Sequence, residues 1–224
     1  MQFSVSDRWK EMYPRAVMGV LVVNKIKNIR QSDELNREKD KLALSLRERF
    51  ASREAIKADA TLQAYAAYYK AFKKNYHVFF QLESVAVKGK PIPRVNALVE
   101  AMFMAELKHH LLTAGHDVDL VAGDVVLDCA TGDERYIAMG GDEKTLKAKD
   151  MYVRDEAGVI SSIIYGPDMR TRISLDTTSA MFTVYAPAGI HEEKIGVHLQ
   201  TMYDWIRLFS PEANYEMMEV YTSV

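Results

Sequence analysis

NALVEAMFMAELKHHLL, residues Asn96–Leu112, predicts one helix that is apolar over most of its length. A run of short strand-like segments follows it as far as Ala186, separated by glycine and acidic residues. Further helical patterns lie before and after this region. The order predicts an α+β fold, in which an antiparallel or mixed β-sheet core is flanked by helices at both ends.

Glycine-centred turns predict two β-hairpins in the strand region. The first is expected to join Asp124–Ala130 to Arg135–Met139, and the second to join Met151–Asp155 to Val159–Tyr165. Ala180–Ala186 predicts a further strand.

The flanking regions also carry recognisable patterns. Ala16–Ile26 is rich in Val and Leu and predicts a buried strand. Ser32 can cap a helix over Asp33–Phe50, a second helix is expected at about Lys57–Lys73, and Ile190–Phe209 predicts a closing helix. We therefore expect a single domain over 1–224, with its core at about 71–186, an N-terminal strand and two helices in 1–70, and a helical extension over 190–224.

Composition narrows the cellular setting. The sequence contains no apolar run of about 18 residues, which would be needed to span a membrane, and its first ten residues include Asp7, Arg8 and Lys10 rather than a signal-peptide core. The single cysteine, Cys129, lies in an apolar run and predicts a buried, inert thiol in a reducing compartment. A cytoplasmic protein without membrane association is expected.

Charge is unevenly distributed along the chain. Residues 1–94 hold 19 Lys and Arg against 10 Asp and Glu, whereas residues 95–224 hold 10 against 21. In the basic part, Lys70, Lys73 and Lys74 interleave with aromatic residues. The pattern predicts either an RNA-binding face or a packed aromatic stripe with solvated lysines, and we favour the packed stripe.

Several classes of active site are excluded by their missing motifs. His109 and His110 are adjacent on a helix and point about 100° apart, so they cannot hold one metal ion as a zinc protease does. The sequence has no nucleophile elbow, phosphate loop or dinucleotide fingerprint. We expect no metal site and no cofactor.

A series of diffuse motifs supplies the main functional indication. The motifs are Val99-Glu100-Ala101-Met102-Phe103, Gly115-His116-Asp117-Val118-Asp119, Gly132-Asp133-Glu134, Gly166-Pro167-Asp168-Met169-Arg170-Thr171 and Thr177-Thr178. Their order and spacing resemble the editing module of the phenylalanyl-tRNA synthetase β subunit, the B3/B4 domain, in its free-standing form.

The resemblance departs from the family pattern at two pocket positions. A threonine and, twelve residues later, a histidine lie in the editing pocket of the synthetase module, and here Met102 and Ala114 occupy those positions. Asp117 matches the aspartate of the second motif. His116 lies two positions after Ala114, where strand alternation would turn it to the same face.

The resemblance also implies roles in hydrolysing the ester between an amino acid and the tRNA 3′ end. His116 and Asp117 would orient the water, and Asp168 or Glu134 would hold the substrate ammonium. The groups that would donate to the carbonyl or the ribose are Arg170, Thr171 and Thr178. Each residue also has a structural interpretation: a turn cap for Asp117, a hairpin-tip charge for Glu134, a surface ion pair for Arg170, a strand edge for Thr178 and an ordinary histidine for His116.

We therefore expect a trans-acting aminoacyl-tRNA deacylase that binds the acceptor end of tRNA and an aminoacyl ester. The apolar Met102 and Ala114 favour an amino acid with an aliphatic or thioether side chain. The alternative is a catalytically silent module that binds tRNA, an amino acid or a protein partner. A third possibility is a small-molecule hydrolase or binding protein that uses the pocket without RNA, because the acidic part of the chain would repel a phosphate backbone.

Overall fold

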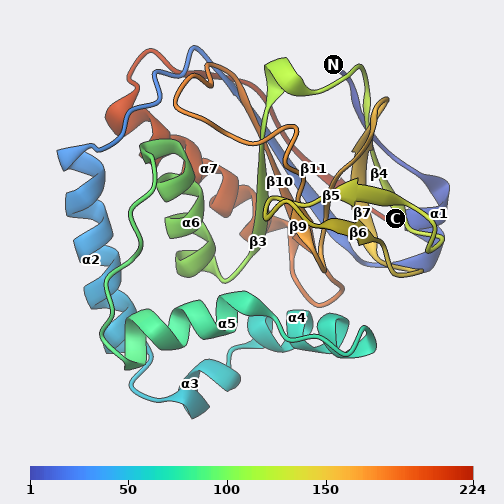
Figure 1. Ribbon diagram of the computed structural model, residues 1–224. Coiled ribbons are helices and arrows are strands. Elements are labelled where there is room, and N and C mark those ends of the chain that lie inside the picture. The colour runs from blue at the N-terminus through green and yellow to red at the C-terminus, as the bar shows by residue number, and fades with distance from the viewer. Residues whose placement is uncertain (224) are drawn as a thin grey trace.

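Two larger β-sheets, a two-stranded sheet and a set of covering helices form the α+β fold that the sequence predicts (Figure 1). The computed structural model describes residues 1–223. Its strands are β1 (Phe3–Val5), β2 (Val17–Asn24), β3 (Leu112–Asp117), β4 (Val125–Cys129), β5 (Arg135–Ile137), β6 (Glu143–Thr145), β7 (Met151–Asp155), β8 (Gly158–Ser162), β9 (Gly166–Pro167), β10 (Ala180–Ala186) and β11 (Asn214–Thr222). Its α-helices are α1 (Asp7–Met12), α2 (Asp33–Arg49), α3 (Arg53–Lys57), α4 (Ala60–Ala71), α5 (His77–Leu82), α6 (Ala97–His109) and α7 (Glu192–Phe209).

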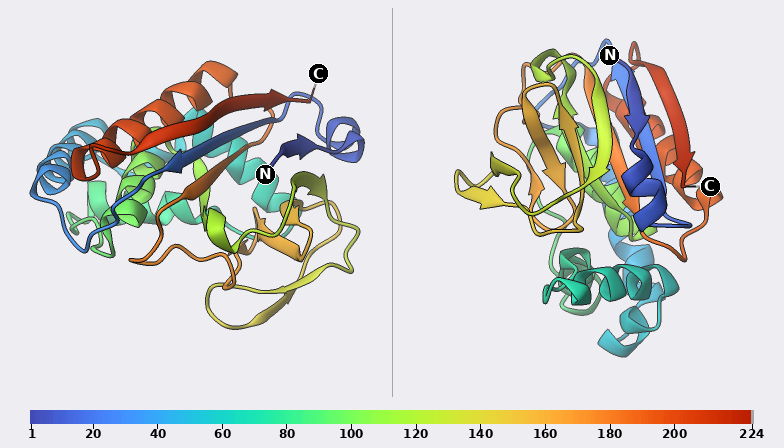
Figure 2. Two further views of the ribbon diagram at one scale, coloured as in Figure 1. Left: turned by 90° about the horizontal axis from the view of Figure 1, so that it is seen from above. Right: turned by 90° about the vertical axis from the view of Figure 1, so that its right-hand side faces the viewer.

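The first sheet is antiparallel and has the strand order β11-β2-β10-β3. Helix α7 lies along one of its faces (Figure 2). A Cβ atom at Gly19 of β2 would come within 2.4 Å of the Ile195 Cγ2 atom of α7. Glycine at this position therefore allows helix and sheet to approach closely.

The second sheet has the order β1-β4-β7-β8-β9, with β1 parallel to β4 and the other pairs antiparallel. It forms a separate layer beside the first sheet (Figure 2). The Tyr185 hydroxyl of β10 lies 2.6 Å from the Ser161 Oγ atom of β8, so a buried polar contact joins the layers. Strand β3 ends one sheet, β9 ends the other, and these two edges meet.

Helices α3 to α5 cover one end of both layers (Figure 1). The tyrosines of α4 are buried rather than displayed, as the packed-stripe interpretation predicts. The Tyr65 hydroxyl donates to the Tyr185 carbonyl and accepts from the Leu112 amide at 2.9 Å. The Tyr69 hydroxyl donates to the Ile163 carbonyl at 2.7 Å. These aromatic side chains thus attach α4 to the ends of both sheets.

The corner between α6 and β3 lies earlier than the sequence predicts. Helix α6 ends at His109, because His110 adopts φ 63° in the left-handed region and its amide still bonds to the Glu106 carbonyl. Leu112, expected to be the last helical residue, is the first residue of β3. Tertiary bonding to Tyr65 replaces the helical hydrogen bond there.

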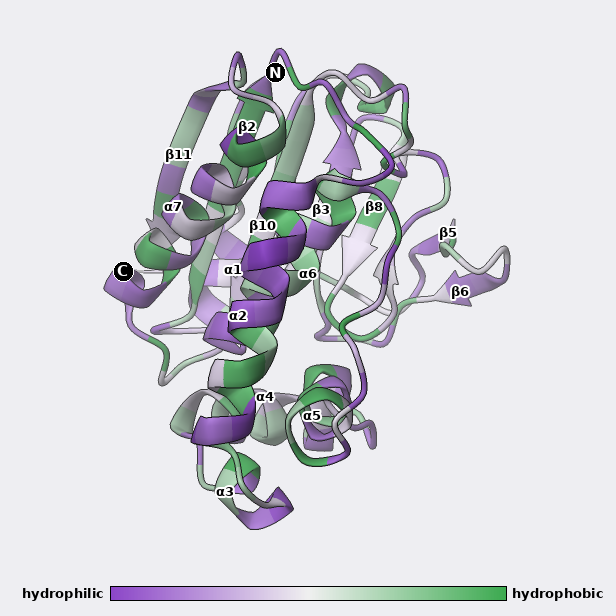
Figure 3. Ribbon diagram, turned by 90° about the vertical axis from the view of Figure 1, so that its left-hand side faces the viewer, coloured by the Kyte–Doolittle hydropathy of each residue, from purple (hydrophilic) through white to green (hydrophobic). Residues whose placement is uncertain are grey.

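Two further expectations are wrong. Strand β4 does not form a hairpin with β5. It pairs with β1 and β7, while β5 pairs with β6 in a projecting hairpin (Figure 3). Residues after Phe209 do not remain helical, because β11 returns to pair with β2 along its length. The second predicted hairpin, β7 with β8, is confirmed. Within residues 1–223, we find no helix that is both long and apolar enough to cross a membrane.

Candidate functional site at the junction of the two sheets

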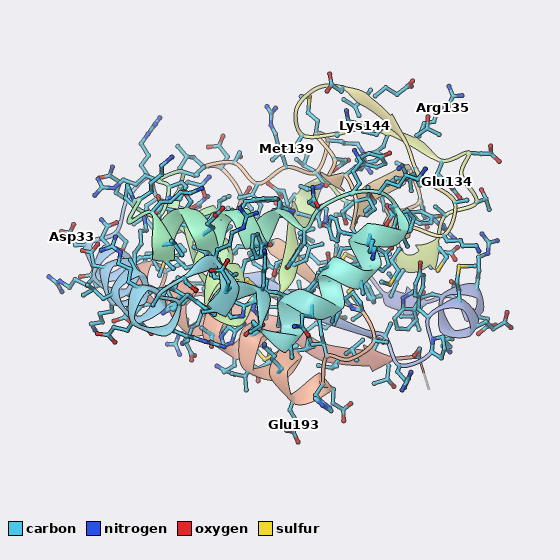
Figure 4. The ribbon with its side chains drawn as sticks, turned by 90° about the horizontal axis from the view of Figure 1, so that it is seen from below. Asp33, Glu134, Arg135, Met139, Lys144 and Glu193 are labelled. Carbon is cyan, nitrogen blue, oxygen red and sulfur yellow. The ribbon has the colours of Figure 1, made fainter. Side chains whose placement is uncertain are left out.

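A cavity of about 230 Å³ lies where the edges of β3 and β9 meet helix α6. We call it the junction pocket. Its lining is largely apolar and comprises His77, Val99, Met102, Glu106, Leu112, Thr113, Ala114, Gly115, Met139, Ser162, Gly166, Pro167, Ile173 and Tyr185. Met139 reaches it from the turn of the β5–β6 hairpin, which Figure 4 shows at the rim of the molecule. Small, mainly apolar cavities with a few polar groups are typical ligand sites.

The free edge of β3 faces this pocket. The Thr113 amide donates to Glu106 Oε1 at 2.8 Å, and the Asp117 amide donates to the Thr171 carbonyl at 2.8 Å. Amides of alternate residues in a strand point to the same edge, so the amide of Gly115, between these two, also points away from β10. A Cβ atom at Gly115 would come within 2.8 Å of Ile173 Cδ1 and 3.1 Å of Met102 Sδ. Glycine therefore keeps the pocket open at this point.

Glu106 supplies a buried carboxyl to the pocket wall. It is 4 % exposed, and burial raises the pKa of its carboxyl to about 8. Glu106 is not among the site residues that the sequence predicts. The available signal was its position on the helix, because Val99, Met102 and Glu106 recur at spacings of three and four residues and so share one face. An acid on an otherwise apolar helix face indicates a buried carboxyl.

Met102 and Ala114, singled out by the resemblance, both line the junction pocket. They come from α6 and β3, and they face the cavity from adjacent walls. Both side chains are apolar, so the lining is apolar at the two positions where the synthetase module carries polar side chains. The pocket's polar groups are instead supplied by the β3 edge and by the side chains of His77, Glu106, Ser162 and Tyr185.

His116 lies on β3 but outside the lining of the pocket. It is fully buried, and its Nδ1 atom lies 2.7 Å from Thr171 Oγ1. The Thr171 hydroxyl donates its proton to Asp168 Oδ1, so in the contact with His116 it is the acceptor. The proton of the neutral imidazole therefore lies on Nδ1, and Nε2 is the unprotonated nitrogen. Among residues 1–223, that Nε2 atom has no hydrogen-bond partner. Burial lowers the pKa of His116 to about 3, so the ring is neutral at pH 7.

Asp117 is also directed into the protein. Its Oδ2 atom accepts from the Thr177 hydroxyl at 2.6 Å, and its Oδ1 atom accepts from the Asp119 amide at 3.1 Å. It thereby caps the short 3₁₀ turn Val118–Leu120. This geometry matches the turn-cap interpretation of Asp117.

The predicted substrate-binding groups around Thr171 form a second polar cluster. Arg170 Nη2 donates to both carboxylate oxygens of Asp155, at 2.9 and 2.8 Å, and Arg170 Nε lies 3.7 Å from Asp168. Asp168 accepts from the Thr171 amide at 3.1 Å. Burial raises the pKa of Asp168. These hydrogen bonds connect the segment after β9 to β3 and to the β7–β8 turn. We call the residues that make them the β3 network, which comprises His116, Asp155, Asp168, Arg170 and Thr171.

Thr178 is exposed and lies 3.5 Å from the carboxylate of Asp119. Glu134 lies at the base of the β5–β6 hairpin, with its side chain at the rim of the molecule (Figure 4). Its carboxylate accepts from the amides of Thr131 and Gly132, so it closes the turn that follows β4. Neither residue is brought to the junction pocket.

The three predicted RNA-binding lysines are exposed around the end of α4. Lys70 and Lys74 border one surface hollow, Lys73 borders another, and the Lys74 Nζ atom lies 5.7 Å from the ring centroid of Tyr165. Tyr165 directly precedes Gly166 of the pocket lining. Lys74 therefore contacts the chain segment next to the pocket lining but is not part of that lining.

Cys129 is buried, and burial raises the pKa of its thiol to about 12, in agreement with an inert cysteine. Over residues 1–223 we find no group of three His, Cys, Asp or Glu side chains arranged to hold a metal ion.

Comparison with known proteins places the fold in context. An N-terminal fragment of the phenylalanyl-tRNA synthetase β subunit from Pyrococcus horikoshii is similar in structure, with a TM-score of 0.49 and 13% sequence identity. The match covers 96% of this chain and 50% of the fragment, so the chain spans about half the fragment's length. No curated protein matches the sequence. The family model described as the B3/4 domain matches residues 60–219, which include the whole junction pocket. The chain belongs to the B3/4 domain family.

Proposed function

We propose that this protein hydrolyses the ester bond of an aminoacyl-tRNA, with the amino-acid side chain held in the junction pocket. One observation carries the proposal. Met102 and Ala114, which the resemblance aligns with the editing-pocket positions, line the same cavity as a buried carboxyl, Glu106. Membership of the B3/4 family supports the same assignment.

The pocket favours a small apolar amino acid. Its volume of about 230 Å³ and the side chains of Val99, Met102, Ala114 and Ile173 suit an aliphatic or thioether group. Each methylene buried there contributes about 1–3 kcal/mol of discrimination. Neighbouring aliphatic amino acids will therefore be separated only modestly.

Glu106 is the best-placed group to accept a proton from the attacking water. A general base works best when its pKa lies near the working pH, and the pKa of Glu106 is about 8. The Gly115 amide, on the neighbouring edge of β3, is the proposed donor to the developing oxyanion. His116 and Asp117 then act by holding β3 and the segment after β9 in place.

A catalytically silent binding module is the second candidate. The observation that favours it is the inward orientation of His116 and Asp117: the Nδ1 atom of His116 contacts Thr171, and the carboxylate of Asp117 accepts from Thr177. In that case Glu106 would serve as a neutral hydrogen-bonding group and the pocket would bind without hydrolysis.

Deacylation of a panel of aminoacyl-tRNAs distinguishes these candidates. We expect hydrolysis of species that carry small apolar amino acids, and a strong loss in Glu106→Gln, which keeps an oxygen to accept from the Thr113 amide. Glu134→Gln is the matched control, because Glu134 lies outside the pocket. Equal hydrolysis by wild type and Glu106→Gln would contradict the role of Glu106. Binding of the same tRNAs without hydrolysis would select the silent module.

A further inference from the structure

A second hollow, of about 640 Å³, lies between the end of α4 and the loop before β7. We call it the lysine groove. Its walls include Tyr13, Tyr68, Phe72, Lys73, Lys147 and Lys149. Three ammonium groups therefore come from two segments that are far apart in sequence. Among the described residues, its lining includes no Asp or Glu.

The backbone around the groove presents these lysines in a defined arrangement. Lys73 and Lys149 are exposed and have φ angles of 56° and 75°, a left-handed conformation that is uncommon outside glycine. Lys147 Nζ donates to the Phe72 carbonyl at 2.8 Å, so it ties the loop to the end of α4. Lys73 and Lys149 both line the groove and are exposed, so their charges are accessible to a ligand.

The floor of the groove is aromatic. The Tyr13 and Tyr68 ring centroids are 5.7 Å apart. Their hydroxyls are occupied, because Tyr13 donates to the Lys149 carbonyl and Tyr68 donates to Asp150 Oδ1 at 2.8 Å. Tyr68 and Phe72 are buried, each 8 % exposed, and Tyr13 is half-buried, so the lysines are the groups that the groove presents to a ligand. A cluster of positive charge suits a nucleic acid strand, whose phosphates pair with lysines.

A buried carboxyl connects the groove and the junction pocket. Asp150 accepts from Tyr68, which lines the groove, and from the side chain of Ser162, which lines the junction pocket. On the surface, Lys74 contacts the ring of Tyr165, which directly precedes Gly166 of the pocket lining.

We propose that the lysine groove binds the phosphate backbone of an RNA strand whose 3′ end enters the junction pocket. The inference concerns a separate site and rests on the proposed function only for the position of the 3′ end. Binding here is mainly electrostatic, since each phosphate contact releases condensed counterions. It explains how an acidic protein can still bind RNA, because the basic groups are concentrated around α4.

The test compares the double variant Lys73→Gln/Lys149→Gln with Lys25→Gln/Lys27→Gln. The control removes the same charge from exposed positions on the far side of the fold, and Lys25 has the same left-handed backbone, with φ 56°. The probe is a fluorescent RNA hairpin with a single-stranded 3′ end, titrated at several salt concentrations. We expect the groove variant to bind more weakly and to lower the slope of log K against log salt by about 1.4, or about 0.7 for each lost phosphate contact. The control should match wild type.

Three outcomes would overturn the proposal: no RNA binding by wild type, equal loss in both double variants, or competition by inorganic phosphate or a mononucleotide at the concentration at which the RNA itself competes. The last would assign the groove to a small phosphate ligand. A protein that binds RNA through the groove but deacylates nothing would contradict the proposed function alone.

Discussion

The two ends of strand β3 differ in how accessible their residues are to a ligand, and this difference is opposite to the one that their residue types indicate. Leu112–Gly115 is apolar or small and lines the junction pocket, whereas His116 and Asp117 are the residue types of a catalytic site. Yet His116 and Asp117 are engaged with Thr171 and Thr177. The chemistry available to a ligand is therefore supplied by Glu106 from α6.

In β3, the accessibility of a side chain to a ligand is therefore a better indicator of function than its residue type. The carboxylate oxygens of Asp117 and the Nδ1 atom of His116 are engaged inside the fold, and a ligand can use these atoms only by breaking those bonds. A carboxyl in a cavity wall, with its pKa shifted by burial, is available to a ligand. Substitutions in the β3 network and in the junction pocket test the two sides of this contrast.

The largest effect is expected in the β3 network. Asp155 is 1 % exposed and accepts from Arg170 and from the amides of Ala122, Ala157 and Gly158. Asp155→Ala leaves a charge and several amides without their partner, so the free energy of unfolding should fall by about 3–5 kcal/mol. Urea denaturation measures it, with Asp119→Ala as an exposed control. A change below about 1 kcal/mol would show that the network is not structural.

The pocket end of β3 should respond in activity rather than stability. Ala114→Phe fills the cavity, and we expect deacylation to fall by about a hundredfold, equivalent to about 2.7 kcal/mol of transition-state stabilisation. Ala114→Ser is the control, since it adds one atom. Steady-state kinetics and thermal unfolding are measured on both. Full activity in Ala114→Phe would place the substrate elsewhere.

Glu106 provides a pH test. Its pKa in the folded protein, about 8, lies above the unfolded value of about 4.3, so the folded state retains a proton that the unfolded chain has released. Its contribution to stability is complete below about pH 4.3 and is lost as pH rises toward 8, at about 1.4 kcal/mol per pH unit.

Denaturation from pH 5 to 8 should show this decline in wild type, and Glu106→Gln should lack that component. Deacylation should rise with pH toward 8 in wild type, after subtraction of spontaneous ester hydrolysis, and not in the variant. His116 has the opposite sign, because its folded pKa of about 3 lies below the unfolded value, so stability is lost as pH falls from about 6.5 to 3. Parallel pH profiles of wild type and Glu106→Gln would contradict the raised pKa.

The smallest effect is expected at Glu134. Its hydrogen bonds to Thr131 and Gly132 close a turn at the rim, and Glu134→Ala should lower the free energy of unfolding by about 0.5–1.5 kcal/mol. Deacylation should stay at the wild-type rate. A clear loss of activity at unchanged stability would restore Glu134 as a ligand-binding residue.

Much of the fold follows from local patterns. The α+β class, helix α2 with its Ser32 cap, strand β2 and the β7–β8 hairpin could all be predicted from periodicity, capping and turn residues. The β4–β5 hairpin could not, because Gly132 permits a turn but does not determine which strand pairs with β4. Strand β11 was missed because its partner, β2, lies at the other end of the chain.

The site was predictable only in part. The resemblance drew attention to Met102 and Ala114, and both line the pocket. Glu106 was overlooked because an acid in a helix is ordinarily a solvated charge. Strand alternation predicts that His116 shares a face with Ala114, but its contacts depend on Thr171, which comes from a segment far away in the sequence.

By itself, the sequence determined which segments are helical or extended, which helix faces are apolar and where charge concentrates, because these depend on neighbouring residues. Only the tertiary structure decided that the edges of β3 and β9 meet, that Glu106 is buried there with its pKa raised to about 8, and that Lys73 and Lys149 face one groove. Cavities, shifted pKa values and charge clusters arise from groups far apart in the chain. Their energies depend on distance and solvent exposure, which exist only once the chain is folded.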